Sequence, residues 1–173
     1  IEADFDPGRR YSSPQDPYSI ITAIGIYLDW METMICLAVP PKRISFEQAN
    51  EMTKDMPEVI LYKTEKEMLD AFLTLIDDAD IISGWNSEGY DIPYIVNRIT
   101  RVMGKAETRR LCLMKKLPKE RKFEQYGREV VSYDLVGRVH LDYLNLYRKY
   151  NYEERHSYRL DYIGEMEIGE KKV

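Results

Sequence analysis

The sequence is poor in the side chains that hold soft metals and cross-link small folds. Its 173 residues include two cysteines and two histidines, which excludes a disulfide framework, a four-cysteine zinc site and a histidine-rich zinc site. Its apolar runs fall far short of the ~18 residues that a membrane-spanning helix needs. The first residues resemble no signal peptide. We therefore expect reduced thiols, as in a reducing cytosol, and no membrane partner.

The glycines also exclude several kinds of site. None of the nine is spaced as Gly-x-Gly, so the loops of dinucleotide-binding folds and kinases are absent. Gly84 and Gly89 have the outer spacing of a phosphate loop, but Tyr90 and Asp91 stand where Lys and Ser or Thr are required. No Gly-x-Ser-x-Gly motif occurs. Any chemistry must therefore depend on carboxylates and a hard metal ion.

Charge is distributed unevenly along the chain. The net charge is −5, which argues against a protein that simply coats DNA. Residues 105–128 nevertheless contain nine Lys or Arg residues and only three Glu residues, so the rest of the chain is strongly acidic. This division suits a protein that holds a phosphate backbone with one surface and metal ions with another. It is equally typical of a solvated, charged loop.

Apolar periodicity predicts the elements of the fold. Residues 119–131 alternate around Tyr126-Gly127 and predict a β-hairpin. Residues 40–63 form a polar, proline-bounded segment for which no element is predicted. The expected strands are residues 1–3, 19–30, 33–39, 80–85 and 139–141. One helix is expected after the capping box at Thr64, and two more are expected over residues 92–103 and 142–150.

This order of elements indicates an α/β fold. A loop over residues 4–18 joins the first two strands, a tight turn joins the second and third as in an antiparallel pair, and later strands are linked by helices. The sequence therefore predicts a mixed sheet with an antiparallel start, helices on both faces and an inserted β-hairpin. No internal repeat is present.

Residues 84–95 run from the end of a predicted strand to the start of a predicted helix, with Asp91 at the helix entrance. An aspartate there is commonly an N-cap, which stabilises a helix by about 1 kcal/mol. Glu2 lies in the short apolar strand 1–3, where a carboxylate is costly to bury unless it meets a cation. Two carboxylates that reach one sheet edge from different elements are what a two-Mg²⁺ phosphoryl-transfer site requires. Glu2 and Asp91 are therefore the candidate catalytic and metal-binding residues.

Three segments together resemble the exonuclease domain of B-family DNA polymerases, in particular the replicative polymerases of large tailed bacteriophages. The sequence Gly84-Trp85-Asn86-x-x-x-Tyr90-Asp91-Ile92-Pro93-Tyr94 resembles the second exonuclease motif, which is highly specific. Residues 132–142 and 157–163 resemble two further segments of that domain. The resemblance covers residue 1 to about residue 168 and implies a ribonuclease-H-like fold.

The resemblance implies roles for individual residues. Glu2 matches the Glu of the first motif, Asp-x-Glu, and Asp91 matches the catalytic Asp of the second. Asn86 and Tyr90 match positions that face the 3′-terminal nucleotides. The implied cofactor is Mg²⁺, or Mn²⁺, with two ions in the complete domain.

Other parts of the chain are expected to contact DNA. The hairpin of residues 119–131 resembles one that helps move the primer end between polymerising and editing sites in phage polymerases. We expect Tyr11, or Phe5, to stack against a frayed base. Asp142 is expected to cap the following helix rather than bind metal. The basic hairpin residues expected to bind DNA are Lys119, Arg121, Lys122 and Arg128.

Two parts of the family pattern are missing from the sequence. The Asp of the first motif would stand directly before Ile1. No tyrosine is followed four residues later by Asp, as the third motif requires, and Tyr158 to Asp161 is one residue too short. We therefore expect residues 1–173 to be a single exonuclease domain truncated at both ends, a fragment of a longer polymerase chain, and nearly inactive alone.

The function implied by the resemblance is proofreading within a DNA-directed DNA polymerase. Two-metal hydrolysis would remove the 3′-terminal nucleotide of single-stranded primer ends during DNA replication. The expected partners are single-stranded DNA with a primer 3′ end, the polymerase domain of the same chain and, through that chain, a sliding clamp. The expected location is cytoplasmic, in the host cell if the protein is viral.

Two alternatives remain open on the sequence. A free-standing ribonuclease-H-like exonuclease would be encoded by a gene little longer than this domain, whereas a polymerase gene would encode several hundred further residues. A non-catalytic module that only grips single strands would bind DNA with strong salt dependence and would need no divalent metal.

Overall fold

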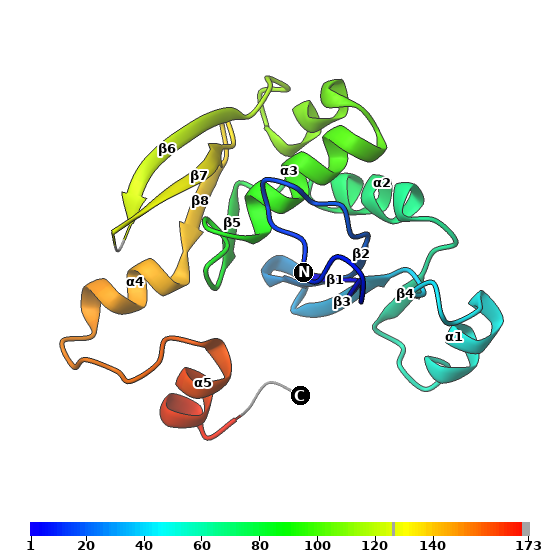
Figure 1. The fold of residues 1–173 in the computed structure, drawn as a ribbon, viewed down its shortest axis with the longest axis horizontal. Helices are drawn as coiled ribbons and strands as arrows, with labels where there is room; N and C mark the ends of the chain where they lie inside the picture. Colours follow the sequence, from blue (N-terminus) through cyan, green and yellow to red (C-terminus); the bar gives the residue numbers. More distant parts are fainter. Residues whose placement is uncertain (126, 171–173) are drawn as a thin grey trace.

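The computed structural model describes residues 1–125 and 127–170, except for the side chains of Gln125 and Arg128. These residues form three small sheets and five α-helices (Figure 1). The first sheet contains β1 (Glu2–Ala3), β2 (Ile21–Leu28), β3 (Thr33–Ala38) and β4 (Val59–Leu61), in that spatial order. β1, β2 and β3 are antiparallel, and β4 runs parallel to β3. The predicted antiparallel start and mixed sheet are therefore confirmed.

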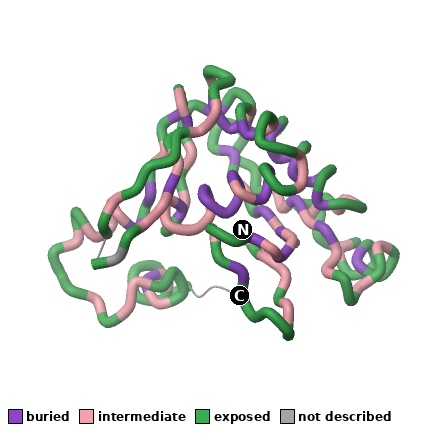
Figure 2. Tube along the Cα trace, turned by 45° about the horizontal axis from the view of Figure 1, so that its top comes forward, coloured by how far each residue is buried: buried purple, intermediate pink, exposed green. Residues whose placement is uncertain are grey.

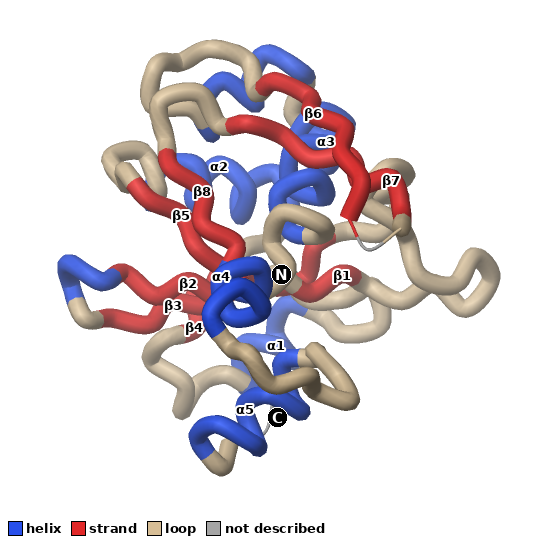
Figure 3. Tube along the Cα trace, turned by 90° about the vertical axis from the view of Figure 1, so that its left-hand side faces the viewer, coloured by secondary structure: helices blue, strands red, loops and turns tan. Residues whose placement is uncertain are grey.

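The other two sheets each have two strands. β5 (Ile81–Gly84) pairs in parallel with β8 (Val139–Asp142), as Figure 3 shows, and the connection between them crosses more than fifty residues. The predicted hairpin is present and consists of β6 (Lys119–Gln125) and β7 (Arg128–Asp134). It ends at Asp134, three residues beyond the expected end at residue 131. Within its turn, Tyr126 lies outside the described residues.

The helices begin where local sequence supplies caps. Thr64 and Glu67 form the predicted capping box, because each side chain accepts a hydrogen bond from the other residue's backbone N–H. Ser45 and Gln48 form a second box that sequence reasoning missed. In the described part of the chain, no helix is long and apolar enough to cross a membrane. The α-helices are α1 (Phe46–Met52), α2 (Glu65–Leu75), α3 (Asp91–Val102), α4 (Tyr143–Tyr150) and α5 (Leu160–Ile168).

The main core lies between α2 and α3 and one face of β2 and β3 (Figure 2). Ile24 and Leu37 are partners across the strand pair and are both almost completely buried beneath the helices. Tyr27 and Met34 are also cross-strand partners, and each is more than half exposed. Helices were expected on both faces of the sheet. In the described residues the packed layer of α2 and α3 covers one face of this strand pair.

A buried ion pair fixes α3 against α2 and β2. The guanidinium of Arg98 donates two hydrogen bonds of 2.7 Å to the carboxylate of Glu65, and both side chains are more than nine-tenths buried. Glu65 also accepts the backbone N–H of Ile21 at 2.8 Å, and Arg98 donates to the carbonyl of Pro17 at 2.9 Å. A bidentate pair of this kind sets orientation as well as distance. It therefore determines where α3, and Asp91 at its start, lies relative to β2.

We expect Glu65→Ala to reduce the free energy of unfolding by about 3–5 kcal/mol, because Arg98 would remain charged and buried without a carboxylate partner. Urea unfolding followed by circular dichroism measures this change. Glu51→Ala is the matched control, since its pair with Lys54 is exposed and such pairs contribute about 0–1 kcal/mol. Equal losses in the two variants would contradict the role given to the buried pair.

Candidate functional site

The candidate site is built at the edge where two parallel strands end. In the register of β5 and β8, Gly84 lies opposite Asp142, so both strands finish at the same level. The chain then forms the loop of residues 85–90, here called the motif loop, and enters α3 at Asp91. A Cβ atom at Gly84 would meet the Ser87 side chain at 3.0 Å. The turn after β5 therefore requires glycine.

β8 holds the motif loop from the side. The carboxylate of Asp142 accepts the backbone N–H groups of Asn86 at 3.1 Å and Glu88 at 2.9 Å. The same carboxylate accepts the N–H of Leu144 at 2.9 Å, so the expectation that Asp142 caps the following helix is confirmed. His140 shares a 2.8 Å hydrogen bond with the hydroxyl of Ser87. The end of β8 thus contacts three consecutive residues of the motif loop.

Asp91 lies in the first turn of α3 rather than at the cap position. The N-cap is Tyr90, whose side chain makes no capping hydrogen bond. The carboxylate of Asp91 instead accepts a 2.8 Å hydrogen bond from the α-amino group of Ile1, and it is three-quarters buried. The interpretation of Asp91 as an ordinary N-cap is therefore wrong. The contact also brings the start of the chain, one residue before Glu2, to the entrance of α3.

Glu2 lies in β1, opposite Ala23 of β2, and is exposed. Together with Tyr11 and Tyr90 it lines a cavity of about 310 Å³. Burial raises the pKa of Tyr90, and so do the neighbouring Tyr94 and the negative charges of Asp91 and Glu2. Both carboxylates are therefore close enough to Tyr90 to act on its hydroxyl, which stays protonated at neutral pH. The structure brings the elements that carry Glu2 and Asp91 together at one place.

Carboxylate oxygens at this place suit a hard divalent cation such as Mg²⁺ or Mn²⁺. Among the residues that the structure describes, however, no group of three or more His, Cys, Asp or Glu side chains is arranged to hold a metal ion. Glu2 and Asp91 by themselves therefore do not make a two-ion site in the described residues.

Of the two residues expected to face the primer end, Tyr90 lines this cavity and Asn86 lies four residues earlier, in the motif loop. Asn86 adopts a left-handed backbone conformation with φ of 56°, and its side-chain oxygen lies 3.0 Å from where a Cβ of Gly89 would be. Glycine at position 89 thus leaves room for the Asn86 amide. Tyr11 is 81% exposed, and its ring centroid lies 4.9 Å from that of Phe5. The two candidate stacking residues are therefore neighbours rather than alternatives at separate places.

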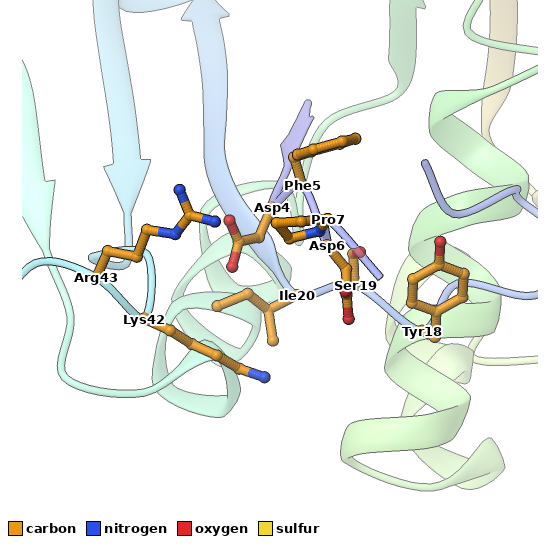
Figure 4. Close-up of a pocket in the computed structure, with 9 residues that line it drawn as sticks. All are labelled: Asp4, Phe5, Asp6, Pro7, Tyr18, Ser19, Ile20, Lys42 and Arg43. Atoms are coloured by element: carbon orange, nitrogen blue, oxygen red, sulfur yellow. The ribbon is translucent and has the colours of Figure 1, made fainter. Parts of the chain in front are cut away.

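A second cavity of about 230 Å³ adjoins the first, since Asp4 lines both. Figure 4 shows the guanidinium of Arg43 directed toward the Asp4 carboxylate, with Lys42 beside it. Sequence reasoning missed these two cations, which lie in the segment for which no element was predicted. Asp6 accepts the backbone N–H of Gly8 at 2.8 Å and so stabilises the loop, consistent with the expectation of a loop carboxylate.

In the part of the hairpin that the structure describes, the side chain of Arg121 reaches the motif loop. Arg121 of β6 forms ion pairs with Glu88 and, at 3.0 Å, with Asp134, and its guanidinium lies over the ring of Phe123. Arg121 was expected to bind DNA, but two carboxylates already engage it here. Lys119 and Lys122 are exposed on the same strand, and the side chain of Arg128 lies outside the described residues.

His140 is a partly buried titratable group next to the motif loop. Burial lowers its pKa, and the positive charge of Arg121 acts in the same direction. Glu88, Asp142 and Asp91 raise it, but burial is the largest effect. The imidazole is therefore neutral at pH 7, as its hydrogen bond with the Ser87 hydroxyl allows.

Because the pKa of His140 is lower in the folded chain than its ordinary value of about 6.5, the unfolded chain binds a proton that the folded chain excludes. We therefore expect the free energy of unfolding to fall as the pH drops through and below that value. Urea titrations between about pH 8 and about pH 5 measure the slope. His140→Gln should flatten it, whereas His156→Gln, at an exposed position, should leave it unchanged. An unaltered slope in the His140 variant would contradict this assignment.

Comparisons with known proteins place the sequence among similar ones. The family model for the exonuclease domain of DNA polymerase family B matches residues 1–163. The DNA-directed DNA polymerase of Escherichia phage RB69 is 33% identical over 137 residues, covering 76% of this chain and 15% of that protein. The corresponding polymerase of Enterobacteria phage T4 is 26% identical over 136 residues, with the same coverage of each chain.

A cellular relative shows that the similarity is not confined to phages. The DNA polymerase delta catalytic subunit of Bos taurus is 34% identical over 121 residues, which cover 64% of this chain and 10% of that protein. The chain thus spans about 15% of the length of the phage relatives that it matches. The resemblance predicted from the three sequence motifs is confirmed, and the chain belongs to the exonuclease domain family of B-family DNA polymerases.

Proposed function

We propose that this chain is the 3′→5′ proofreading exonuclease domain of a B-family DNA polymerase, a single domain within a longer chain. The observation that carries the proposal is the approach of the start of β1, at Ile1, to Asp91 in the first turn of α3, beside a cavity that Glu2, Tyr11 and Tyr90 line. It brings a carboxylate-bearing strand and a carboxylate-bearing helix to one place beside exposed aromatic rings. This is the arrangement that hydrolysis at the end of a single strand needs.

The strand arrangement supports a ribonuclease-H-like fold. Three antiparallel strands come first, and the later parallel pair, β5 and β8, is connected through α3 and the hairpin. In such a fold the functional carboxylates project from strand ends and an adjoining helix start. Glu2 on β1 and Asp91 on α3 occupy positions of these two kinds.

The proposed substrate is the 3′ end of a single-stranded DNA primer. Tyr11 and Phe5 offer an aromatic surface to an unpaired base, and Asn86 and Tyr90 offer hydrogen bonds to the terminal nucleotides. Lys119 and Lys122 on the hairpin attract the phosphate backbone, and this contribution should weaken as salt is added.

Glu2 and Asp91 would hold the divalent ions, Mg²⁺ or Mn²⁺, together with carboxylates from family motifs that this sequence does not contain. Ions bound there supply water activation and charge neutralisation for in-line hydrolysis of the terminal phosphodiester. Tyr90 stays protonated next to both carboxylates and is therefore able to donate a hydrogen bond to substrate. The proposed partners are the polymerase domain of the same chain and, through it, a sliding clamp.

In the full-length polymerase, we expect Asp91→Ala to lower the rate of single-strand degradation by at least about 100-fold, because an ion-binding carboxylate is lost. Primer extension on a paired template should continue. Quenched-flow assays with a 3′-labelled oligonucleotide and Mg²⁺ measure the first activity, and nucleotide incorporation measures the second. Asp55→Asn, an exposed carboxylate between α1 and β4, is the control and should change neither. Undiminished degradation by the Asp91 variant would overturn the proposed function.

The 173-residue chain by itself is expected to degrade single-stranded DNA barely above background, since Glu2 and Asp91 do not complete a two-ion site. Gel assays with Mg²⁺ and with EDTA measure this directly. Robust Mg²⁺-dependent degradation would contradict the ligand assignment. DNA binding that falls steeply with salt, with no cleavage by the full-length protein either, would favour a non-catalytic single-strand-binding module instead.

A further inference from the structure

We infer that Asp142 is a positioning residue for the exonuclease site, whose carboxylate sets the conformation of the motif loop between Asn86 and Asp91. The inference rests on the proposed function for its kinetic consequence. Its structural part, the dependence of the loop on one side chain, is independent of that function.

The geometry exceeds what helix capping requires. A capping side chain typically accepts a hydrogen bond from one or two N–H groups of the first helical turn, and Asp142 accepts that of Leu144. It also accepts the N–H groups of Asn86 and Glu88, more than fifty residues earlier in the sequence. Asp142 is 8% exposed, so its carboxylate is largely shielded from water. Hydrogen bonds to an ionised carboxylate are about twice as strong as neutral ones.

The two bonds act on the part of the loop that leads to Asp91. Asn86 has a left-handed backbone, a conformation that is uncommon for non-glycine residues and that asparagine adopts more readily than most. Its carbonyl accepts the N–H of Tyr90 at 3.1 Å, and the carbonyl of Ser87 accepts that of Ile92 at 2.9 Å. The position set at Asn86 is therefore transmitted through backbone hydrogen bonds to both neighbours of Asp91.

Other contacts on the loop reach side chains rather than backbone. Glu88 accepts a hydrogen bond from the Asn145 amide at 3.0 Å and pairs with Arg121, whose side chain is 43% exposed. His140 reaches the hydroxyl of Ser87. These contacts leave the backbone N–H groups at 86 and 88 to Asp142, which makes its carboxylate the group whose removal should release the loop.

The decisive variant is Asp142→Ser, because serine is a good N-cap and is too short to reach Asn86 and Glu88 as well as Leu144. We expect the amide protons of Asn86 and Glu88 to exchange at least about 10-fold faster, while those of α4 keep their protection. In the full-length polymerase, kcat for single-strand degradation should fall by about 10–100-fold with primer extension unchanged. Amide exchange followed by NMR on the 173-residue chain and quenched-flow kinetics give the two readouts.

Two further variants separate positioning from stability. Asp142→Asn retains one accepting oxygen and should recover part of both the amide protection and kcat. Thr64→Ala removes the cap of α2, far from the loop, at a comparable cost in stability of about 1 kcal/mol, and should leave kcat unchanged.

Unchanged exchange at Asn86 and Glu88 in Asp142→Ser would overturn the inference, and so would faster exchange with kcat intact. Equal loss of protection throughout α4 would assign Asp142 to capping alone and would also overturn it. If the wild-type polymerase showed no exonuclease activity, the proposed function would fail, and the amide exchange would still decide whether Asp142 sets the loop.

Discussion

The site depends on the parallel pairing of β5 and β8. Because these strands end together at Gly84 and Asp142, the turn that leaves β5 lies within reach of the last side chain of β8. A shift of one residue in this register would turn Asp142 to the opposite face of the sheet and leave two backbone N–H groups of the motif loop without their acceptor. The arrangement around Asp91 therefore depends on the pairing of two four-residue strands that are more than 50 residues apart in the sequence.

Local signals in the sequence were sufficient for most elements. The capping box at Thr64, the alternation around Tyr126-Gly127 and the apolar runs of β2 and β3 each predicted an element that the structure contains. α1 and β4 were missed within residues 40–63, although Ser45 and Gln48 carry the same capping signal as Thr64. Proline-rich flanks obscured that signal, and a three-residue strand is too short to show periodicity.

The candidate site was only partly predictable, because its key contacts are long-range. Glu2, Asp91 and Asn86 were identified from motif spacing, but spacing shows which residue types are present and not what they touch. Nothing local indicates that Asp142 accepts N–H groups from the motif loop, or that Arg121 pairs with Glu88. Such contacts depend on tertiary packing that brings distant segments together. The count of basic residues in 105–128 was similarly incomplete as a sign of a phosphate-binding surface, because Arg121 is already paired with Glu88 and Asp134.

That neutralisation changes how the hairpin should act on DNA. With Arg121 held between Glu88 and Asp134, the free positive charge of the described part of β6 lies on Lys119 and Lys122. A phosphate that approached Arg121 would have to compete with two carboxylates, one of which belongs to the motif loop. Movement of the hairpin would therefore act on Glu88, whose backbone N–H is held by Asp142. The hairpin and the motif loop are in this way connected to Asp142 by two consecutive polar contacts, an exposed one that salt can weaken and a partly buried one.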